Sequence, residues 1–311
     1  MAKLGVIAIF GPTASGKSAV AEALAERIPA RLVSADAMQV YRGVPILTNQ
    51  SRHPTELVAI WDLAHEASVG EYAELAHRAI DSALDEGLTP VVVGGTGLYL
   101  RAALAELDLP PAPKAGAREQ WERAYEELGA RRAHELLAER DPEAAAHVHP
   151  NDQQRVVRAL ELTESGASLA PREAQLWSEQ MRRPTLVVGL EVPRHELDRR
   201  IAERTREMFE RGAREEALRA LASPISATAR TIHGLLEAAE LPQDDAIQTL
   251  ARRTRRYAAY QRKWMRRIPG LVSLPADRPP GEVADAILEV ARTRQRLPAG
   301  PALGPRGAAD A

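Results

Sequence analysis

The chain contains no cysteine, which excludes disulfide bonds, thiolate chemistry and zinc sites built on cysteine. Charge of one sign is also scarce, because 41 basic residues nearly balance 43 acidic ones and the formal net charge is −2. Any attraction to nucleic acid must therefore come from local clusters of basic side chains. No apolar run approaches the roughly 18 residues that a membrane-spanning helix needs, and the N-terminus shows no signal-peptide pattern. We expect a cytoplasmic protein that does not enter a membrane.

What is present is an ordinary globular composition. Of the 311 residues, 45% are apolar and 27% charged, which is enough chain for one large or two modest domains. Only residues 298–311, rich in proline, glycine and alanine, are expected to be disordered, because they have little apolar surface to bury.

The stretch from Leu4 to Glu26 organises the rest of the chain. Its apolar, β-branched run from 6 to 10 predicts a buried strand, and a helical pattern with Val20, Leu24 and Ile28 on one face follows a glycine-rich turn. A strand, a turn and a helix in this order form the context in which a phosphate-binding loop is expected.

The turn itself fits G-x-x-x-x-G-K-[ST] at every fixed position. Gly11 and Gly16 let successive backbone N–H groups point inward, Lys17 adds a mobile cation, and the hydroxyl of Ser18 can ligate Mg²⁺. The motif predicts a cage for a di- or triphosphate and does not say which one. The residues assigned to it are Gly11, Pro12, Thr13, Ala14, Ser15, Gly16, Lys17 and Ser18.

Two further strands are expected at residues 31–34 and 89–93, separated by a loop over 49–63 and by a helix that begins near Ser68 and ends at Gly87. Strands that alternate with helices through short glycine junctions predict an α/β fold with a doubly wound parallel sheet, similar to that of the P-loop NTPases.

Two polar residues follow these strands. Asp36 lies at the carboxyl end of the second strand, where open parallel sheets bind ligands. Its carboxylate can capture Mg²⁺, accept a proton or cap the next helix. Thr96 lies in the run Gly94-Gly95-Thr96-Gly97 after the third strand. We expect these glycines to bring backbone close to a ligand, the alternative being a tight turn without one.

After the proline-rich segment 110–113 the pattern becomes helical, without a strand, up to about residue 180. We expect one helix with a stripe of Trp121, Tyr125 and Leu128, a second around Leu137, and further helices that begin near residues 141 and 151. The predicted organisation is a core over 1–113, a helical insertion over 114–182, and the second part of the core with C-terminal helices over 183–297. His147 and His149 within the insertion lack the partners of a metal site.

The chain rejoins the sheet with a strand at 185–190, and helices follow. Arg200 and Arg204 share a helical face, for which salt bridging at the surface is an alternative to a functional role. The stretch 252–267 has eight basic residues and no acid, with Tyr257, Tyr260 and Trp264 at i, i+3 and i+7. The aromatic stripe indicates a core contact, and the basic residues favour contact with a phosphate backbone.

Four motifs together resemble the tRNA dimethylallyltransferase (tRNA isopentenyltransferase) family. They are the GPTASGKS loop at 11–18, the D-x-x-x-x-Y pattern at 36–41, V-G-G-T-G-L-Y at 93–99, and H-P-N-D-x-x-R-x-x-R-A-L-E at 149–161. Their order is that of the family, and the match extends over roughly residues 4–270.

The resemblance implies transfer of a dimethylallyl group from dimethylallyl diphosphate to N6 of adenosine 37 of tRNA, with release of pyrophosphate. On the family pattern the loop 11–18 holds the diphosphate with Mg²⁺, which Ser18 ligates. Asp36 accepts the N6 proton, Thr96 contacts the tRNA and the reacting centre, and Arg200 neutralises the pyrophosphate. The acceptor adenosine is expected to enter a deep channel between core and insertion. The implied tRNA contacts are Asp36, Ala37, Met38, Gln39, Thr96, Gln154, Arg155, Arg158, Gly234, Arg262, Lys263 and Arg266.

Two segments differ from the family pattern, which often has A-I-G-Y where this chain has residues 232–235 (IHGL), and K-R-Q-x-T-W-x-R where it has residues 259–266 (AYQRKWMR). Three alternatives remain open from the residues: a small-molecule kinase, an isopentenyltransferase that acts on free adenine nucleotide, and an RNA-binding protein with a decayed site. The glycine-threonine end of the third strand, the helical insertion and the intact Lys17, Asp36 and Thr96 argue against each of these in turn. The chain has no strongly apolar helix for an interface, so we expect a monomer.

Overall fold

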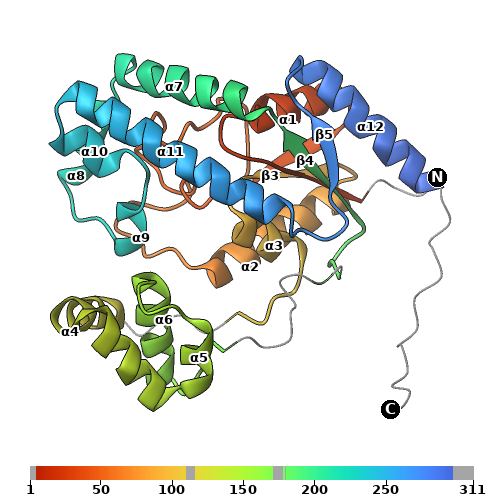
Figure 1. Cartoon of the computed structure of the whole chain (residues 1–311). Helices are drawn as coiled ribbons and strands as arrows, with labels where there is room; N and C mark the ends of the chain where they lie inside the picture. Colours follow the sequence, from red (N-terminus) through yellow and green to blue (C-terminus); the bar gives the residue numbers. More distant parts are fainter. Residues whose placement is uncertain (1–4, 110–115, 171–177, 179, 297–311) are drawn as a thin grey trace, which may run out of the picture.

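The structure, a computed structural model, describes residues 5–109, 116–170, 178 and 180–296 (Figure 1). The predicted proline-rich boundary at 110–113 and the predicted disordered tail at 298–311 lie outside these residues. The strands are β1 (Val6–Phe10), β2 (Ala30–Ser34), β3 (Thr89–Gly94), β4 (Thr185–Glu191) and β5 (Val272–Pro275). The helices before β4 are α1 (Lys17–Ala25), α2 (Val69–Asp85), α3 (Gly97–Leu104), α4 (Ala117–Arg140), α5 (Pro142–His147) and α6 (Gln153–Glu164). Those after it are α7 (Arg194–Glu210), α8 (Ala213–Leu221), α9 (Ala227–Arg230), α10 (Leu235–Glu240), α11 (Gln243–Met265) and α12 (Pro280–Arg296).

The five strands form one parallel sheet in the order β2-β3-β1-β4-β5. β1 is central and fully buried, because apolar side chains point to both faces of the sheet. Val6, Ala8 and Phe10 join one core cluster, and Ile7 and Ile9 join the other. The predicted α/β fold with helices on both faces is confirmed, and the predicted strands are present. The expectation of helices after residue 190 is wrong at 272–275, because β5 pairs with β4 at the edge of the sheet.

Helices cover both faces of the sheet (Figure 1). α1 and α12 lie over one face, where Arg27, just after the end of α1, forms an ion pair with Asp285 of α12 at 2.6 Å. α2 and α3 lie over the other face. α7 and α11 pack against each other above the edge where the strands end, which leaves α11 in contact with α3. This arrangement positions α7 and α11 over the loops that follow β1 and β3.

The helices α4, α5 and α6 lie between β3 and β4 in sequence and apart from the sheet in space (Figure 1). They have a core of their own around Trp121, Leu137, Val156 and Leu160. α4 is broken at Gly129, which has φ 77° and ψ 160°, so it consists of two helical pieces, as the sequence predicted. The predicted stripe in the first piece is wrong at Leu128, which is 45% exposed because it is the last side chain before this break.

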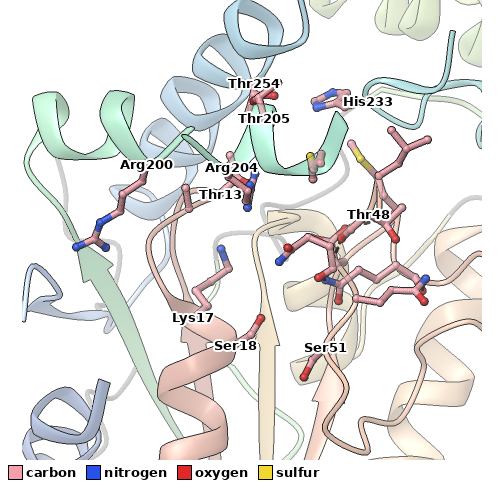
Figure 2. A pocket seen from close by; sticks show the side chains of 18 of the residues that line it. Thr13, Lys17, Ser18, Thr48, Ser51, Arg200, Arg204, Thr205, His233 and Thr254 are labelled. Atoms are coloured by element: carbon pink, nitrogen blue, oxygen red, sulfur yellow. Dashed lines mark hydrogen bonds between the residues drawn. The ribbon is translucent and has the colours of Figure 1, made fainter. Parts of the chain in front are cut away.

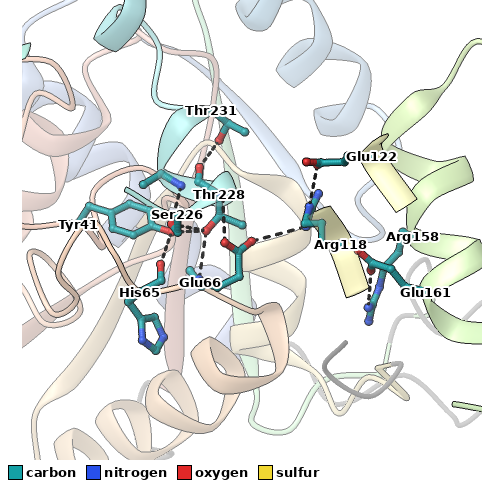
Figure 3. Close-up of polar contacts among 12 residues, drawn as sticks. Tyr41, His65, Glu66, Arg118, Glu122, Arg158, Glu161, Ser226, Thr228 and Thr231 are labelled. Atoms are coloured by element: carbon teal, nitrogen blue, oxygen red, sulfur yellow. Dashed lines mark hydrogen bonds and ion pairs between the residues drawn. The ribbon is translucent and has the colours of Figure 1, made fainter. Parts of the chain in front are cut away.

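Polar contacts join the helical insertion to the core. Arg118 of α4 forms an ion pair with Glu66 at 3.7 Å, and Glu66 accepts a hydrogen bond from the backbone N–H of Thr228 (Figure 3). Where the chain returns to the sheet, Arg182 forms ion pairs with Asp81 at 3.0 Å and Glu106 at 2.7 Å. Glu66, Asp81 and Glu106 lie on or next to α2 and α3, so both sets of contacts join the insertion to the face of the sheet that these helices cover.

One predicted helix end is wrong. α1 ends at Ala25, so Ile28 lies beyond the helix, although it still packs against the core cluster of α1. Among the described helices, none is both long and apolar enough to cross a bilayer.

Candidate active site at the carboxyl edge of the sheet

The phosphate loop follows β1 directly and ends in α1. Gly16 has φ 88°, a conformation that glycine adopts without strain, and it places the first N–H groups of α1 toward the loop. A Cβ at Gly11 would lie 2.8 Å from Oγ of Ser15 and 3.3 Å from atoms of Leu190, so a larger residue would have to displace its neighbours. The local sequence therefore builds the loop as predicted, with Lys17 as the first residue of the helix.

A cavity of about 660 Å³ opens in front of this loop (Figure 2). It is bounded by the phosphate loop and α1, by residues 36–39 after β2, by the segment 47–52, and by the inner faces of α7 and α11. None of its lining residues comes from the described part of the insertion. The prediction of a channel between core and insertion is wrong for this cavity, because α7 and α11 rather than α4–α6 cover the sheet edge.

Two partly buried cations face the cavity without a carboxylate partner in the described part of the chain. Lys17 donates from Nζ to the carbonyl of Pro12 at 2.8 Å, and Arg204 donates from Nη2 to Oγ1 of Thr13 at 2.5 Å. Burial lowers the pKa of Lys17 to about 8, opposed by Asp36 and assisted by Arg204. Burial likewise lowers the pKa of the Arg204 guanidinium. Two desolvated cations at the positive end of a helix suit a multiply charged anion.

Arg200, the arginine singled out from the sequence, lies one helical turn before Arg204. Its Nε donates to Glu196 at 2.7 Å, and Glu196 also pairs with Arg199 at 2.7 Å. Arg200 lines the cavity, but Figure 2 shows its guanidinium turned away from Lys17 and Ser18. In the sequence, Arg204 was considered only as a neighbour of Arg200 on one helical face. The spacing of four residues between them was the signal that both could line the same site.

Asp36 lies at the end of β2 and lines the cavity. Its Oδ1 accepts the backbone N–H of Met38 at 3.0 Å, an interaction that fixes the carboxylate in a turn rather than at a helix N-terminus. The N–H of Ala37 donates to Oγ1 of Thr96 at 3.2 Å, so the loops after β2 and β3 are joined. Gln39 completes this group, since its Oε1 accepts a hydrogen bond from Ser34.

At the glycines around Thr96, the space that a side chain would occupy is filled by other parts of the protein. A Cβ at Gly94 would lie 2.0 Å from the carbonyl oxygen of Ala35, one at Gly95 would lie 2.2 Å from Nε2 of Gln261, and one at Gly97 would lie 2.1 Å from the ring of Trp264. Protein atoms therefore fill the positions that a Cβ would occupy, although Gly94 lines a second, small cavity beside Lys17, Ser18 and Asp36. The expectation that these glycines bring backbone close to a ligand stays a prediction. Their small size lets β3 approach β2 and lets α11 pack on the loop.

The inner face of α11 differs from the prediction. Tyr260 is 55% exposed, so the aromatic stripe is not a core contact throughout. The buried face instead carries small and polar residues, among them Thr254, Ala258 and Gln261. Tyr257 lines the cavity with its hydroxyl 3.3 Å from Oγ1 of Thr96, and burial raises its pKa.

His233 was noted in the sequence only as a departure from the family pattern. It lines the cavity and meets Tyr257 edge to face, with ring centroids 4.7 Å apart. Burial, with a smaller effect of Arg253, lowers the pKa of His233 to about 4, so the ring is neutral at pH 7. The next residue, Gly234, is buried with φ 89° and supports this turn rather than facing the cavity.

The segment 47–52 was not predicted to form part of the site. It is held by Glu216 of α8, which is 2% exposed and accepts the backbone N–H groups of Ile46 at 2.9 Å and Leu47 at 2.8 Å. Nothing in the local sequence links residues that are separated by about 170 positions.

The predicted tRNA contacts fall in three places. Ala37, Met38, Gln39 and Thr96 lie at or beside the cavity. Lys263 and Arg266 are exposed and Arg262 is half-buried, all on α11 or at its end. Gln154 and Arg155 are exposed on α6, where Arg158 pairs with Glu161 at 3.0 Å. The structure thus brings the first group together with the phosphate loop, whereas the groups on α11 and α6 lie outside the cavity.

These features define the class of the protein: a parallel α/β fold with a phosphate loop, to which a helical insertion has been added between β3 and β4. Comparison with known proteins then shows that the chain belongs to the IPP transferase family, whose model matches residues 39–268. A second model, of isopentenyl transferases, matches residues 4–57.

Individual relatives agree with this assignment. A tRNA dimethylallyltransferase of Thermobifida fusca is 40% identical over 293 residues, which are 88% of this chain and 91% of that protein. The crystal structure of a tRNA isopentenylpyrophosphate transferase of Bacillus halodurans is 29% identical with a TM-score of 0.65, and the match covers 95% of this chain and all of the other. A eukaryotic dimethylallyltransferase, 24% identical, shares the fold with a TM-score of 0.73, over 95% of this chain and 81% of its own.

Proposed function

We propose that the protein transfers the dimethylallyl group of dimethylallyl diphosphate to N6 of adenosine 37 in tRNA, which gives N6-dimethylallyladenosine and pyrophosphate. The family and the names of its members support the reaction class. The observation that carries the proposal is the pair of cations, Lys17 and Arg204, that faces the same cavity as the carboxylate of Asp36.

Each side of the cavity has a role in this reaction. The bond from C1 of the prenyl group to the diphosphate oxygen breaks, the bond from N6 to C1 forms, and N6 loses a proton. The N6 amine is a weak nucleophile because its lone pair is delocalised into the ring. A positioned carboxylate such as that of Asp36, which accepts this proton, contributes roughly 10² to 10⁴ in rate. Thr96 is placed to orient the same amine, since its hydroxyl lies between Ala37 and Tyr257.

Charge that develops on the departing pyrophosphate needs cations in fixed positions. Lys17, Arg204 and the N-terminus of α1 supply them at the phosphate loop, and Arg200 lies farther out along the cavity wall. The two inner cations are already held by Pro12 and Thr13, so little reorganisation accompanies the reaction.

The site also fits Mg²⁺. In the described part of the chain no three acidic or histidine side chains gather closely enough to cage a metal. Ser18, Glu22 and Asp36 nevertheless present oxygen atoms around the same cavity. Mg²⁺ is commonly held by one or two protein oxygens together with substrate phosphates. We propose that Ser18 ligates Mg²⁺ on the diphosphate, where the ion would neutralise charge on the leaving group.

For the acceptor we propose that the anticodon arm docks on the exposed basic face of α11 and on α6, with adenosine 37 turned out of its stack into the cavity. Because the acceptor is tRNA, we place the reaction in the cytoplasm. Within the described residues the large exposed apolar side chains, Leu128, Leu218 and Tyr260, lie on three separate helices, which favours a monomer.

The test is a mass spectrum of nucleosides from unmodified tRNA that has been incubated with the protein, Mg²⁺ and dimethylallyl diphosphate. We expect a dimethylallyl mass gain on adenosine, located at position 37 by fragmentation. Binding of tRNA without a mass gain would contradict the donor. If neither occurs and ATP is consumed with a small-molecule acceptor, the protein is a kinase and the proposal is wrong.

A further inference from the structure

Gln261 uses both ends of its side-chain amide to connect the two loops of the site. It is 2% exposed, on the inner face of α11. Its Oε1 accepts the backbone N–H of Thr13 in the phosphate loop at 2.7 Å. Its Nε2 donates to the carbonyl of Gly95 in the loop after β3 at 2.9 Å. A single buried side chain therefore spans the gap between the donor loop and the loop that carries Thr96.

These two partners determine which side chain can do this. A backbone N–H only donates and a carbonyl only accepts, so the residue must offer an acceptor and a donor side by side. Glutamate offers no donor, methionine neither group, and asparagine is shorter by one carbon. Gly95 is matched to this contact, because a Cβ there would lie 2.2 Å from Nε2 of Gln261. The close packing leaves the amide little freedom to move without moving both loops.

The same helix carries other contacts on either side of Gln261. One turn earlier, the hydroxyl of Tyr257 lies 3.3 Å from Oγ1 of Thr96, and one turn later the ring of Trp264 packs on Gly97. Thr13 is held a second time, by Arg204. Arg262 and Lys263 follow Gln261 directly and Arg266 lies at the end of the helix; these are the cations proposed to hold RNA. α11 is thus fixed to both loops on one face and presents the basic cluster on another.

We propose that Gln261 is a positioning residue that couples RNA docking on α11 to diphosphate binding at the phosphate loop. This inference rests on the proposed function for the identity of the two ligands. RNA that holds α11 in place also keeps the Gln261 amide bonded to Thr13 and Gly95. The phosphate loop and the loop that carries Thr96 then stay at a fixed distance from each other. By linkage, pyrophosphate must then raise the affinity for RNA by the same factor by which RNA raises the affinity for pyrophosphate.

The experiment measures this factor directly, with pyrophosphate and an anticodon stem-loop RNA as probes and no turnover. The Kd of each probe is determined alone and with the other at saturation, in wild type, Q261M, Q261E and the control Q248M. Gln248 is an exposed glutamine on the same helix, so Q248M makes the same chemical change away from both loops. Circular dichroism and thermal unfolding report the folded state of each variant.

We expect a coupling factor of about fivefold or more in wild type and Q248M, and a factor near one in Q261M. The RNA affinity of Q261M in the absence of pyrophosphate should be unchanged, because no RNA-binding cation has been altered. In turnover, Q261M should lower kcat by about 10²-fold, as expected for misplacement of the reacting groups by about 1 Å, with a smaller effect on KM for RNA.

Q261E is the second variant: it keeps the shape and an acceptor for Thr13, and it replaces the donor to Gly95 by a carboxylate oxygen that repels the Gly95 carbonyl. It should show an intermediate coupling factor. A wild-type factor of one would overturn the proposal, as would an unchanged factor in both Gln261 variants. Equal losses of affinity for both probes, in parallel with a fall in Tm, would reduce Gln261 to a packing role. Because the probes bind without reaction, these results are independent of whether dimethylallyl transfer is observed.

Discussion

Arg204 of α7 and Thr13 of the phosphate loop are joined by a hydrogen bond of 2.5 Å from Nη2 to Oγ1. The contact fixes a partly buried guanidinium beside the loop, within electrostatic reach of Asp36 and Lys17. Arg200, on the same face of the helix, is instead held by Glu196. The two arginines therefore differ in what they can do for an anion in the cavity.

The first prediction compares these two arginines. Arg204→Ala should lower kcat/KM for dimethylallyl transfer by about 10² to 10³, the usual loss when one preorganised donor to developing charge is removed. Arg200→Ala should lower it less than tenfold, because its guanidinium is neutralised by Glu196. Steady-state kinetics with saturating RNA measure both. A larger loss in the Arg200 variant would assign the pyrophosphate contact to Arg200, as the family resemblance implies.

The second prediction concerns the base. Asp36→Asn keeps the shape of the side chain and an acceptor for the N–H of Met38, but its amide cannot take up the N6 proton. Turnover should fall by about 10² to 10⁴, while the Kd for the RNA stays within about twofold of wild type. Single-turnover rates and RNA binding are measured on the same preparation. Wild-type turnover in this variant would remove Asp36 as the base.

A third prediction tests the basic face of α11. Alanine at Arg262, Lys263 or Arg266 should weaken RNA binding and lower the slope of log Kd against log salt by about one for each phosphate group that the RNA no longer binds through that cation. Arg292→Ala on α12 is the matched control, since this arginine is exposed on a different helix. Binding is measured by titration at several salt concentrations. Equal slopes in the α11 variants and the control would place the RNA elsewhere.

The fourth prediction follows from the pKa of Lys17, which burial lowers to about 8. Below pH 8 the ammonium is already charged, whereas above it pyrophosphate binding must first protonate it. The affinity for pyrophosphate should therefore decline above pH 8, by up to about tenfold per pH unit, with proton uptake on binding. Calorimetry in buffers of different ionisation enthalpy detects that uptake.

The control for this titration is Lys17→Arg, whose guanidinium stays charged throughout this range. Its pyrophosphate affinity should follow only the ionisation of the ligand. Parallel pH profiles for wild type and Lys17→Arg would show that Lys17 does not titrate in this way.

The fifth prediction concerns stability in acid. The pKa of His233 is lowered in the folded state, to about 4, below the value of about 6.5 in the unfolded chain. Between these values the unfolded state binds the extra proton, so the free energy of unfolding should fall as pH falls from 6.5 to 4 and level off below. The contribution is on the order of 3 kcal/mol. Denaturant titrations of His233→Gln should lack this component, whereas the exposed His195→Gln should keep it.

Much of the fold could be predicted from the sequence because its signals are local. Central parallel strands are buried on both faces, so β1 and β3 contain apolar runs rich in β-branched residues, and the spacing of Gly11, Gly16, Lys17 and Ser18 marks the phosphate loop. Asp36 and Thr96 could be placed near the phosphate loop because carboxyl ends of parallel strands share an edge.

The rest depends on contacts between distant segments. The aromatic spacing on α11 pointed to a stripe through Tyr260, but the helix packs on backbone loops, which select a small or hydrogen-bonding face at Ala258 and Gln261. From the sequence pattern, Glu216 cannot be distinguished from an exposed acidic residue of an amphipathic helix. Its role is visible only when Ile46 and Leu47 are seen to donate to it.

The strand order has a consequence for how the chain is made. β1 is synthesised long before its neighbour β4, which begins only at Thr185, after the insertion. α12, which packs on α1, is synthesised later still. Until then β1 has an unpaired apolar edge, which is prone to aggregation. The strand that leads into the phosphate loop therefore gains its second neighbour in the sheet only after the insertion has been made. A fragment that stops before the insertion would leave this edge of β1 exposed permanently.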